Sequence, residues 1–404
     1  MKKLLYISYC APYDSVRHAG GKTHNYYLKE LSKSFNIKLV TYVKDDEIDK
    51  MDLDKYHIDH NYINYPVTKL QRLWSKIINV ESRLNPFNRY GCFVSNYEAI
   101  KIKTVLEKLR KEKYIPDVIL LEWTQILFLL PIIKKYYPNI PVYEIEVDVA
   151  FLGKERIADG KQAGIKKAIA YRKASRVKEL ELTHLKEVDK VFTNNDKDKQ
   201  LLISHGIDKV DVLMPFYDDY STCQYNPNSK NILFFGAMDR PENWKTAIWF
   251  IDNVMPLLDH GFTYTVVGNH PPKELLDKRN ARVIITGFVE KVDPYFENSL
   301  CLASPLVLGA GVKVKIIEAM TSGIPVVCNR ISIEGINAIN GIDYIHCEKA
   351  EEFAEAINRL AVDKGFAETI GQGGKRVVIN NYSYIRDCEK LATIICDSIE
   401  KERC

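Results

Sequence analysis

Residues 300–327 read LCLASPLVLGAGVKVKIIEAMTSGIPVV, and this stretch decides the expected fold. An apolar run at Leu300–Ser304 predicts a buried strand, and a glycine-containing loop follows it. The next segment, Val312–Thr321, has apolar residues at the i, i+4 and i+7 spacing of a buried helical stripe, and a second strand is expected at Pro325–Cys328. Two buried strands joined through a helix predict a βαβ unit with parallel strands.

The same alternation runs along all 404 residues, a length that suits two domains of ~150 residues or more. Further strands are expected at Lys3–Tyr9, Ile37–Val43, Val118–Trp123, Val142–Val147, Lys190–Asn194, Asn231–Gly236, Phe262–Gly268, Val283–Phe288 and Asp343–Cys347. Helices expected between them include Thr23–Ser34, Trp244–Leu258 and Ala350–Leu360. Buried strands alternating with helices predict an α/β fold of two doubly wound, Rossmann-like parallel-sheet domains that face each other across a cleft.

Polar residues and Pro227 cluster in the segment 211–230, which we expect to join the two domains. Residues 1–210 would form the first domain and residues 211–380 the second. An amphipathic helix at about Ser383–Glu400, within the terminal residues 381–404, would pack back toward the first domain.

The charge is distributed unevenly between the halves. Residues 1–210 hold 37 Lys and Arg against 27 Asp and Glu, whereas residues 211–404 hold 20 against 26. A basic half suits anionic lipid headgroups, and the chain lacks the interleaved arginines and aromatics or the reader motifs of nucleic-acid-binding proteins. No run of about 18 apolar residues occurs, so no segment is expected to span a bilayer.

Nine scattered cysteines without a Cys-x-x-Cys pair favour a reducing compartment and argue against structural zinc or a disulfide framework. The apolar stretch after Lys3 is too short for an export signal, so we expect a cytoplasmic protein that contacts the inner face of the cell membrane. Asp52-Leu53-Asp54 has the form of a metal motif but lies in an acidic run typical of a solvated surface. We therefore expect neither a metal nor a cofactor.

The loop and helix after Leu300–Ser304 have the features of an anion site. Gly309 and Gly311 allow the backbone to come close to a ligand, and the N–H groups at a helix start favour negative charge. Lys313 and Lys315 would face the positive end of that helix, a conflict that a bound diphosphate removes. Alternatively both lysines are simply solvated, at little cost.

Glu318 would share one helix face with Gly311 and Lys315. An ionised carboxylate only accepts hydrogen bonds, which suits the paired hydroxyls of a ribose. From spacing alone, an i, i+3 ion pair with Lys315 explains Glu318 at least as well.

This window resembles the donor site of GT-B glycosyltransferases of the large retaining "group 1" family. In that family a strand, a glycine-rich loop and a helix of the form Lys-x-x-Glu-Ala-Met-x-x-Gly-x-Pro-Val-Val hold a sugar nucleotide. Phe234–Asn243 resembles the turn that opens the second domain, and Val266–Asn269 with Thr286–Val289 resembles the strand ends that meet the base. Gly20-Gly21 resembles the loop that closes on the donor phosphates.

The resemblance implies roles for particular residues. The expected catalytic residues are Lys313, Lys315, Glu318 and Asp148. The expected donor-binding residues are Gly20, Gly21, Gly236, Asn243, Gly268, Val289, Ala310, Gly311 and Val312. The two lysines and the helix start would stabilise the diphosphate leaving group without a metal.

Three further residues, His18, Glu122 and Glu146, are acceptor-side candidates. His18 lies in an expected loop, where a lone histidine is often just solvated. Glu122 ends an apolar strand and is either a ligand contact or a strand cap. Glu146 and Asp148, two apart at a strand end, should point the same way, so that like charge raises the pKa of one carboxyl and suits acid–base work or binding of acceptor hydroxyls.

Two other segments of the first half leave alternatives open. Residues 71–80 combine Leu73, Trp74, Ile77 and Ile78 with Arg72 and Lys76, and Lys154–Lys178 is a basic helical stretch. Peripheral contact with an anionic membrane and an ordinary surface helix explain both equally well.

The sequence thus predicts a glycosyltransferase that moves a sugar from a nucleoside-diphosphate sugar to a glycan or lipid-linked acceptor, in surface polysaccharide or glycoconjugate synthesis. By resemblance, the anomeric configuration is retained. The sequence departs from the family pattern in three places. Ala310 stands where the family has its first glutamate, and Ala237 and Asn243 stand where it has basic residues. Glu146-Val147-Asp148 stands where the family has a histidine. A catalytically silent GT-B partner or chaperone of another glycosyltransferase is therefore one alternative, and a nucleotide-sugar epimerase is another.

Overall fold

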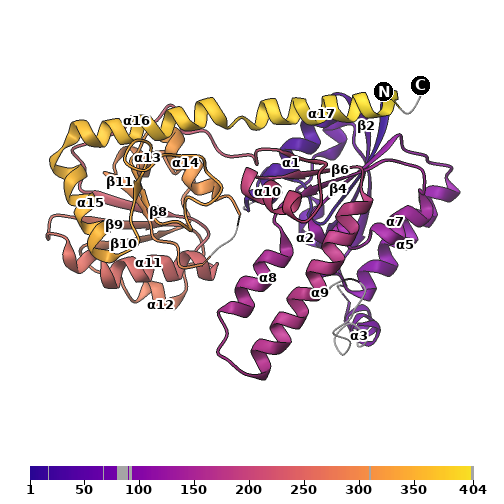
Figure 1. Cartoon of the computed structure of the whole chain (residues 1–404), viewed down its shortest axis with the longest axis horizontal. Coiled ribbons are helices and arrows are strands. Elements are labelled where there is room, and N and C mark those ends of the chain that lie inside the picture. The colour runs from indigo at the N-terminus through magenta and orange to yellow at the C-terminus, as the bar shows by residue number, and fades with distance from the viewer. Residues whose placement is uncertain (17, 67, 80–89, 91–92, 309–310, 402–404) are drawn as a thin grey trace. The chain divides into compact units, whose positions relative to one another are not determined.

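The computed structural model describes residues 1–16, 18–66, 68–79, 90, 93–308 and 311–401, and the chain forms two compact units (Figure 1). Unit 1 comprises Met1–Met214 together with Ile385–Cys404, and unit 2 comprises Pro215–Tyr384. In these described ranges no helix combines the length and the apolar character needed to cross a membrane.

Unit 1 is built on a seven-stranded parallel sheet in the order β3-β2-β1-β4-β5-β6-β7. Its strands are β1 (Lys2–Ser8), β2 (Phe35–Val43), β3 (Asp59–Asn64), β4 (Val118–Glu122), β5 (Val142–Glu146), β6 (Lys190–Thr193) and β7 (Val210–Val212). Leu5 on the inner strand β1 pairs with Lys38 of β2 and Ile119 of β4. Because successive side chains of a strand point to opposite faces, Leu5 packs into one core cluster and Leu4 into another.

Helices cover both faces of this sheet. They are α1 (Ala19–Leu31), α2 (Asp45–Ile48), α3 (Lys69–Ile78), α5 (Asn96–Lys111), α6 (Thr124–Leu127), α7 (Leu130–Tyr136), α8 (Ala150–Asp159), α9 (Ile165–Glu187), α10 (Asp196–Ser204) and α17 (Tyr384–Lys401), with a 3-10 turn at Leu53–Tyr56. The last helix packs beside α1, because Leu391 and Ile395 join the same core cluster as Leu28 and Leu31. The ammonium of Lys2 donates a 2.8 Å hydrogen bond to a carbonyl of α17.

Unit 2 is built on a six-stranded parallel sheet in the order β10-β9-β8-β11-β12-β13. Its strands are β8 (Asn231–Phe235), β9 (Thr263–Val267), β10 (Val283–Gly287), β11 (Cys301–Ser304), β12 (Val326–Cys328) and β13 (Ile345–His346). Its helices are α11 (Pro241–Asn253), α12 (Lys273–Leu276), α13 (Asp293–Glu297), α14 (Val314–Ser322), α15 (Ala350–Val362) and α16 (Lys364–Asn381), with a 3-10 turn at Met255–Leu257. Its core centres on residues such as Ile232, Phe250 and Tyr264.

The predicted α/β class, two Rossmann-like parallel-sheet domains, is confirmed by these sheets. Two strands were missed, β3 and β7, and both lie at sheet edges. Only one residue of β3 is buried, and β7 has three residues, so neither carries the apolar run by which a central strand is recognised. The helix expected at Trp244–Leu258 ends at Asn253 and continues as the 3-10 turn.

Candidate functional site

The amino end of α14 in unit 2 holds a half-buried lysine. Lys315, the second residue of the helix, donates a hydrogen bond from Nζ to Oδ1 of Asn243 near the start of α11. Nζ also lies 4.9 Å from the ring centroid of Phe234 on β8, and a Cβ added to Gly236 would lie 2.9 Å from it. Gly236, Asn243 and Lys315, which the sequence assigned to one site, therefore meet in the structure.

Lys315 has a hydrogen-bonding partner but, among the described residues, no salt bridge with a carboxylate. The ion pairs at this end of α11 and α14 join Arg240 to Glu242 and Lys313 to Glu334, and neither includes Lys315. Burial lowers the pKa of the Lys315 ammonium to about 7, and the neighbouring charge of Arg240 acts in the same direction. Any anion that reaches this ammonium would stabilise its charged form, so the position selects negatively charged ligands.

Lys313 stands immediately before α14, as its N-cap residue, and not within the first helical turn as expected. Its ammonium donates a hydrogen bond to the carbonyl oxygen of Gly311 and lies 3.9 Å from a carboxylate oxygen of Glu334. A carboxylate of the protein thus balances part of its charge. Of the two lysines predicted to bind phosphate, Lys315 is the one that forms no salt bridge within the described part of the chain.

The loop before α14 also differs from the expectation, because the helix begins at Val314 and not at Val312. Gly311 precedes the helix in the left-handed conformation, with a φ of 68°, and so does not share a helix face with Glu318. Val312 is half-buried in the same loop. Ala310, predicted to contact the donor, lies outside the described residues.

Glu318 lies within α14 and is 8% exposed. Its Oε1 accepts a 3.3 Å hydrogen bond from the backbone N–H of Asp218, and Thr321 accepts one of 3.0 Å from the N–H of Tyr220. These contacts hold the segment that enters unit 2 against α14. Lys315 turns toward Asn243, so the alternative Lys315–Glu318 ion pair is not formed.

Gly236 and Gly268 follow neighbouring strands, β8 and β9, and their backbones touch. A Cβ on Gly268 would lie 1.8 Å from the carbonyl oxygen of Gly236, which no other residue type could accommodate. The N–H of Gly236 donates to Val267 and the N–H of Gly268 donates to Gly287, each at 3.0 Å. The loops after β8, β9 and β10 are therefore tied together, and Val289 lies half-buried in the last of them.

In unit 1, His18, Gly20 and Gly21 form the start of helix α1 and not the expected loop. The Nδ1 atom of His18 accepts a 2.9 Å hydrogen bond from the N–H of Gly21, and this cap lets the helix begin at Ala19. A Cβ on Gly21 would lie 2.7 Å from the His18 ring, and one on Gly20 would lie 3.5 Å from the ring of Trp123. His18 is thus a helix cap, and the glycine at position 21 makes room for it.

Glu122 at the end of β4 is fully buried in a hydrogen-bonded cluster. One carboxylate oxygen accepts a 2.6 Å hydrogen bond from the hydroxyl of Tyr6 and lies 2.5 Å from Nδ1 of His24 on α1. Burial, followed by the proximity of Glu122, raises the pKa of Tyr6 well above its usual value. Glu122 is therefore an internal partner of His24, a residue that no sequence spacing would have singled out.

Glu146 and Asp148 do not point the same way, so that prediction was wrong. Glu146, the last residue of β5, is 1% exposed and accepts a hydrogen bond from the hydroxyl of Thr124. Asp148 lies in the following bend and is exposed. The strand ends at Glu146, so the alternation that would have aligned the two side chains stops there.

The buried carboxyl of Glu146 belongs instead to a cluster with Glu144 and Glu181. Glu181 on α9 accepts hydrogen bonds from the N–H groups of Ala150 (2.8 Å) and Phe151 (2.9 Å) at the start of α8. Burial, followed by the charges of Glu181 and Glu144, raises the pKa of Glu146 well above its usual value. Burial also raises the pKa of Glu181 to about 7. Glu181, which still binds a proton near neutral pH, thus holds the first turn of α8 in place through these two hydrogen bonds.

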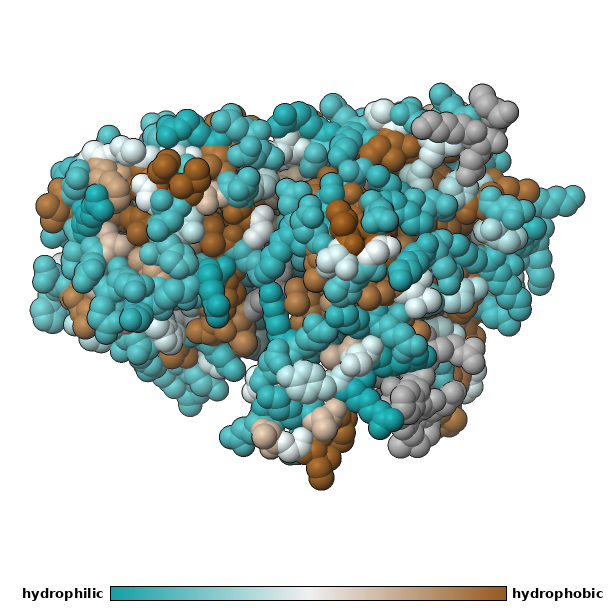
Figure 2. All heavy atoms as spheres, in the orientation of Figure 1, coloured by the Kyte–Doolittle hydropathy of each residue, from teal (hydrophilic) through white to brown (hydrophobic). Residues whose placement is uncertain are grey.

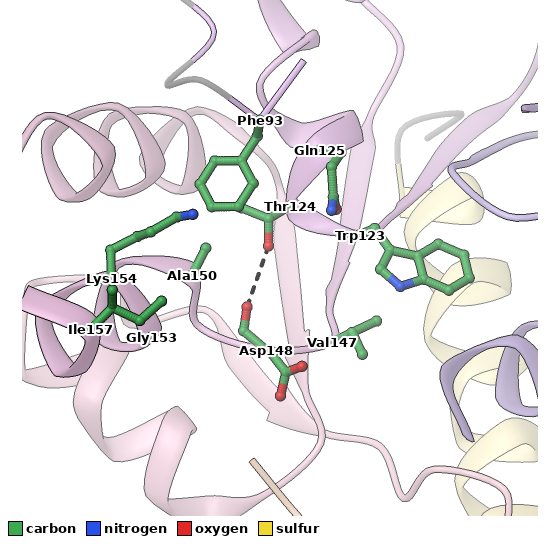
Figure 3. A pocket seen from close by; sticks show the side chains of 10 residues that line it. All are labelled: Phe93, Trp123, Thr124, Gln125, Val147, Asp148, Ala150, Gly153, Lys154 and Ile157. Carbon is green, nitrogen blue, oxygen red and sulfur yellow. Dashed lines mark hydrogen bonds between the residues drawn. The ribbon is translucent and has the colours of Figure 1, made fainter. Parts of the chain in front are cut away.

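A hollow of about 260 Å³ lies beside the carboxyl ends of β4 and β5 in unit 1. Figure 3 shows the side chains that line it. Thr124 points across it toward Asp148 and donates a 3.3 Å hydrogen bond to the carbonyl oxygen of that residue. The lining residues are Phe93, Trp123, Thr124, Gln125, Val147, Asp148, Ala150, Gly153, Lys154 and Ile157. Aromatic rings beside hydroxyl, amide, carboxylate and ammonium groups suit a saccharide, which presents C–H faces as well as hydroxyls.

Residues 229–363, which include the Lys315 site, match the protein family described as "Glycosyl transferases group 1". A Klebsiella pneumoniae protein described as "Uncharacterized 44.6 kDa protein in cps region" is 23% identical over 190 residues, which cover 44% of this chain. The match spans 46%, about half, of the length of that relative.

Several solved structures resemble the whole chain. Anabaena Alr3699/HepE in complex with UDP has a TM-score of 0.65 at 16% identity, covering 98% of this chain and 100% of that one. Sucrose-phosphate synthase from Thermosynechococcus elongatus has a TM-score of 0.69 at 14% identity, covering 99% and 100%. An S. aureus TarM variant in complex with Fondaparinux, alpha-GlcNAc-glycerol and UDP has a TM-score of 0.66 at 12% identity, covering 98% and 100%. These similarities show that the fold is GT-B.

Proposed function

From a GT-B fold that carries a group 1 glycosyltransferase domain at residues 229–363, we propose that this protein is a glycosyltransferase that uses a nucleoside-diphosphate sugar. The observation that carries the proposal is the ammonium of the half-buried Lys315, held beside Gly236 and Asn243 with no salt bridge to a carboxylate among the described residues. A diphosphate would place negative charge directly against this ammonium. The Anabaena HepE structures, which contain UDP or UDP-glucose, support a donor of this class.

Transfer places negative charge on the leaving diphosphate as its bond to the sugar breaks. Lys315 would neutralise that charge, with Lys313 and the N–H groups at the start of α14 completing the site. Because Asn243 already holds the ammonium of Lys315 in place, little reorganisation is needed during the reaction. We propose accordingly that the reaction requires no metal ion, that Glu318 accepts hydrogen bonds from the ribose, and that the anomeric configuration is retained.

The hollow beside Trp123 and Asp148 is our proposed site for a glycan or lipid-linked acceptor. The exposed carboxylate of Asp148 can accept a hydrogen bond from an acceptor hydroxyl, and the indole of Trp123 offers an apolar surface to a sugar ring. The saccharides in the TarM structure and the cps region named for the Klebsiella relative support a role in surface polysaccharide synthesis. The free cysteines among the described residues suit a reducing compartment, so we place the activity in the cytoplasm, at the inner face of the membrane.

The test is a screen of UDP- and GDP-sugars, each with and without saccharide acceptors, followed by product analysis. A glycosyltransferase releases the nucleoside diphosphate and forms a glycoside when the acceptor is present. A silent partner of another transferase gives no product with any donor. An epimerase converts the sugar nucleotide without an acceptor, and either of these two results would contradict the proposal.

A further inference from the structure

Helix α3 (Lys69–Ile78) exposes the side of the helix that proteins normally bury. Four large apolar residues follow the i, i+3, i+4, i+7 spacing of a single helix face: Leu70, Leu73, Trp74 and Ile77. Their exposed fractions are 79%, 56%, 49% and 62%. An amphipathic surface helix of a globular protein turns such a stripe toward the core, so α3 has the reverse arrangement.

The helix is nevertheless anchored to unit 1. The indole of Trp74 meets the ring of Tyr97 on α5 edge-on, with 5.9 Å between centroids. Asn96 donates a 3.2 Å hydrogen bond to the carbonyl of Ile78, and the N–H of Tyr97 donates one of 3.2 Å to Asn79. The carboxyl end of α3 is therefore fixed on α5 while the apolar stripe stays exposed.

The polar residues around the stripe are basic. Helix α3 contains no acidic residue, and its Lys69, Arg72 and Lys76 are exposed. The tip of the α8–α9 hairpin repeats this combination, with Ile165 81% exposed and Ile157 59% exposed. Three lysines (Lys161, Lys166 and Lys167) outnumber the one exposed acidic residue there, Asp159. In Figure 1 the α8–α9 hairpin and α3 project at the same end of unit 1, and Figure 2 shows apolar atoms at the hairpin tip.

We infer that α3 and the tip of the α8–α9 hairpin form a docking surface for an anionic lipid bilayer. The surface is both apolar and basic, and both properties fit such a membrane. Apolar side chains enter the acyl boundary, while basic side chains reach the headgroup phosphates. Protein–protein interfaces, in contrast, are depleted in lysine, which is plentiful here. The inference does not depend on the proposed transfer reaction.

Co-sedimentation of the full chain with lipid vesicles tests this surface. We expect binding to vesicles of phosphatidylglycerol and phosphatidylcholine, a marked loss of binding in high salt, and little binding to phosphatidylcholine alone. The double variant Leu73→Ser/Ile77→Ser should partition onto the anionic vesicles roughly tenfold or more weakly, because two apolar anchors are lost. Ile379→Ser is the matched control, since Ile379 is 63% exposed on α16 in unit 2, and it should bind as the wild type does.

The basic residues are tested separately with Arg72→Gln/Lys76→Gln, which should weaken anionic binding and reduce its salt dependence without changing Tm. The inference is overturned if the wild type fails to bind anionic vesicles, if it binds neutral vesicles equally well, or if the Leu73→Ser/Ile77→Ser variant binds like the wild type. A dimer in sedimentation velocity that this variant abolishes would show that a second copy covers the stripe, and would overturn it as well.

Discussion

The ammonium of Lys315 on α14 lies against the amide oxygen of Asn243 on α11, and this contact joins side chains 72 positions apart in the sequence. Asn243 in turn donates a 2.8 Å hydrogen bond to the carbonyl oxygen of Ala237 in the turn after β8. Both side chains are thereby fixed before a ligand arrives. A fixed cation loses little conformational entropy on binding, which favours affinity for an anionic donor.

Affinity for a nucleoside-diphosphate sugar should fall as the pH rises above about 7. The pKa of Lys315 is lowered to about 7 in the ligand-free protein, and only the charged ammonium attracts the diphosphate. Both phosphates of the sugar nucleotide are esterified and do not titrate in this range. We expect the affinity to fall by up to about tenfold per pH unit between about pH 7.5 and 8.5. Binding should be accompanied by proton uptake, which calorimetry in two buffers measures. A flat affinity over this range would show that Lys315 does not bind the phosphates.

Gly268→Ala should destabilise unit 2 severely, because its Cβ would lie 1.8 Å from the carbonyl oxygen of Gly236. We expect a loss of about 3 kcal/mol or more in the free energy of unfolding, measured in urea. Gly287→Ala is the matched control, since Gly287 also has a positive φ of 77° but no atom within 4 Å of an added Cβ. That variant should lose only about 1–2 kcal/mol. Equal losses in the two variants would show that the contact with Gly236 is unimportant.

The free energy of unfolding should fall as the pH rises from about 5 to 7, in part because of the buried carboxyl cluster. The folded-state pKa values of Glu144, Glu146 and Glu181 are raised, so the folded protein binds more protons than the unfolded chain in this window. Each group contributes at most about 1.4 kcal/mol per pH unit. Glu146→Gln should flatten the dependence, whereas Glu179→Gln, at an exposed position of α9, should leave it unchanged. An unaltered slope in Glu146→Gln would contradict the assigned cluster.

Asp148→Asn should lower kcat/KM for the acceptor about tenfold while leaving nucleotide affinity unchanged. The exposed carboxylate lines the hollow in unit 1, and its replacement weakens a charge-assisted hydrogen bond to an acceptor hydroxyl. Asp208→Asn, at another exposed position of unit 1, is the control and should behave like the wild type. Loss of nucleotide affinity in a correctly folded Asp148→Asn variant would show that the residue serves the donor instead.

The sequence predicted the central strands and the βαβ unit around α14, because their apolar periodicity records burial directly. It did not predict the edge strand β3, in which only Ile63 is buried. The boundaries of some helices also differ from the predicted ones. The His18 side chain caps α1 and moves its start to Ala19, ahead of the expected Thr23.

The residues of the donor motif could be recognised from sequence because they follow the ends of successive strands, where parallel sheets present their loops. Contacts between residues far apart in the sequence could not be recognised in this way. His24 meets Glu122 across 98 positions, and Glu181 reaches the start of α8, yet neither residue lies in a motif. Asp148 and Glu146 diverge because β5 stops between them, a detail that alternation alone does not reveal.

The most direct test of the account is the binding of UDP, GDP and the matching nucleosides to the wild type, Lys315→Met and Lys245→Met, measured by calorimetry. Lys245 is an exposed lysine of α11 and serves as the matched control. If Lys315 holds the diphosphate, Lys315→Met should weaken binding of the preferred nucleoside diphosphate roughly tenfold to hundredfold, because a charge-assisted hydrogen bond is lost. Binding of the nucleoside, and all binding to Lys245→Met, should be nearly unchanged. Unaltered diphosphate affinity in correctly folded Lys315→Met protein would contradict the account.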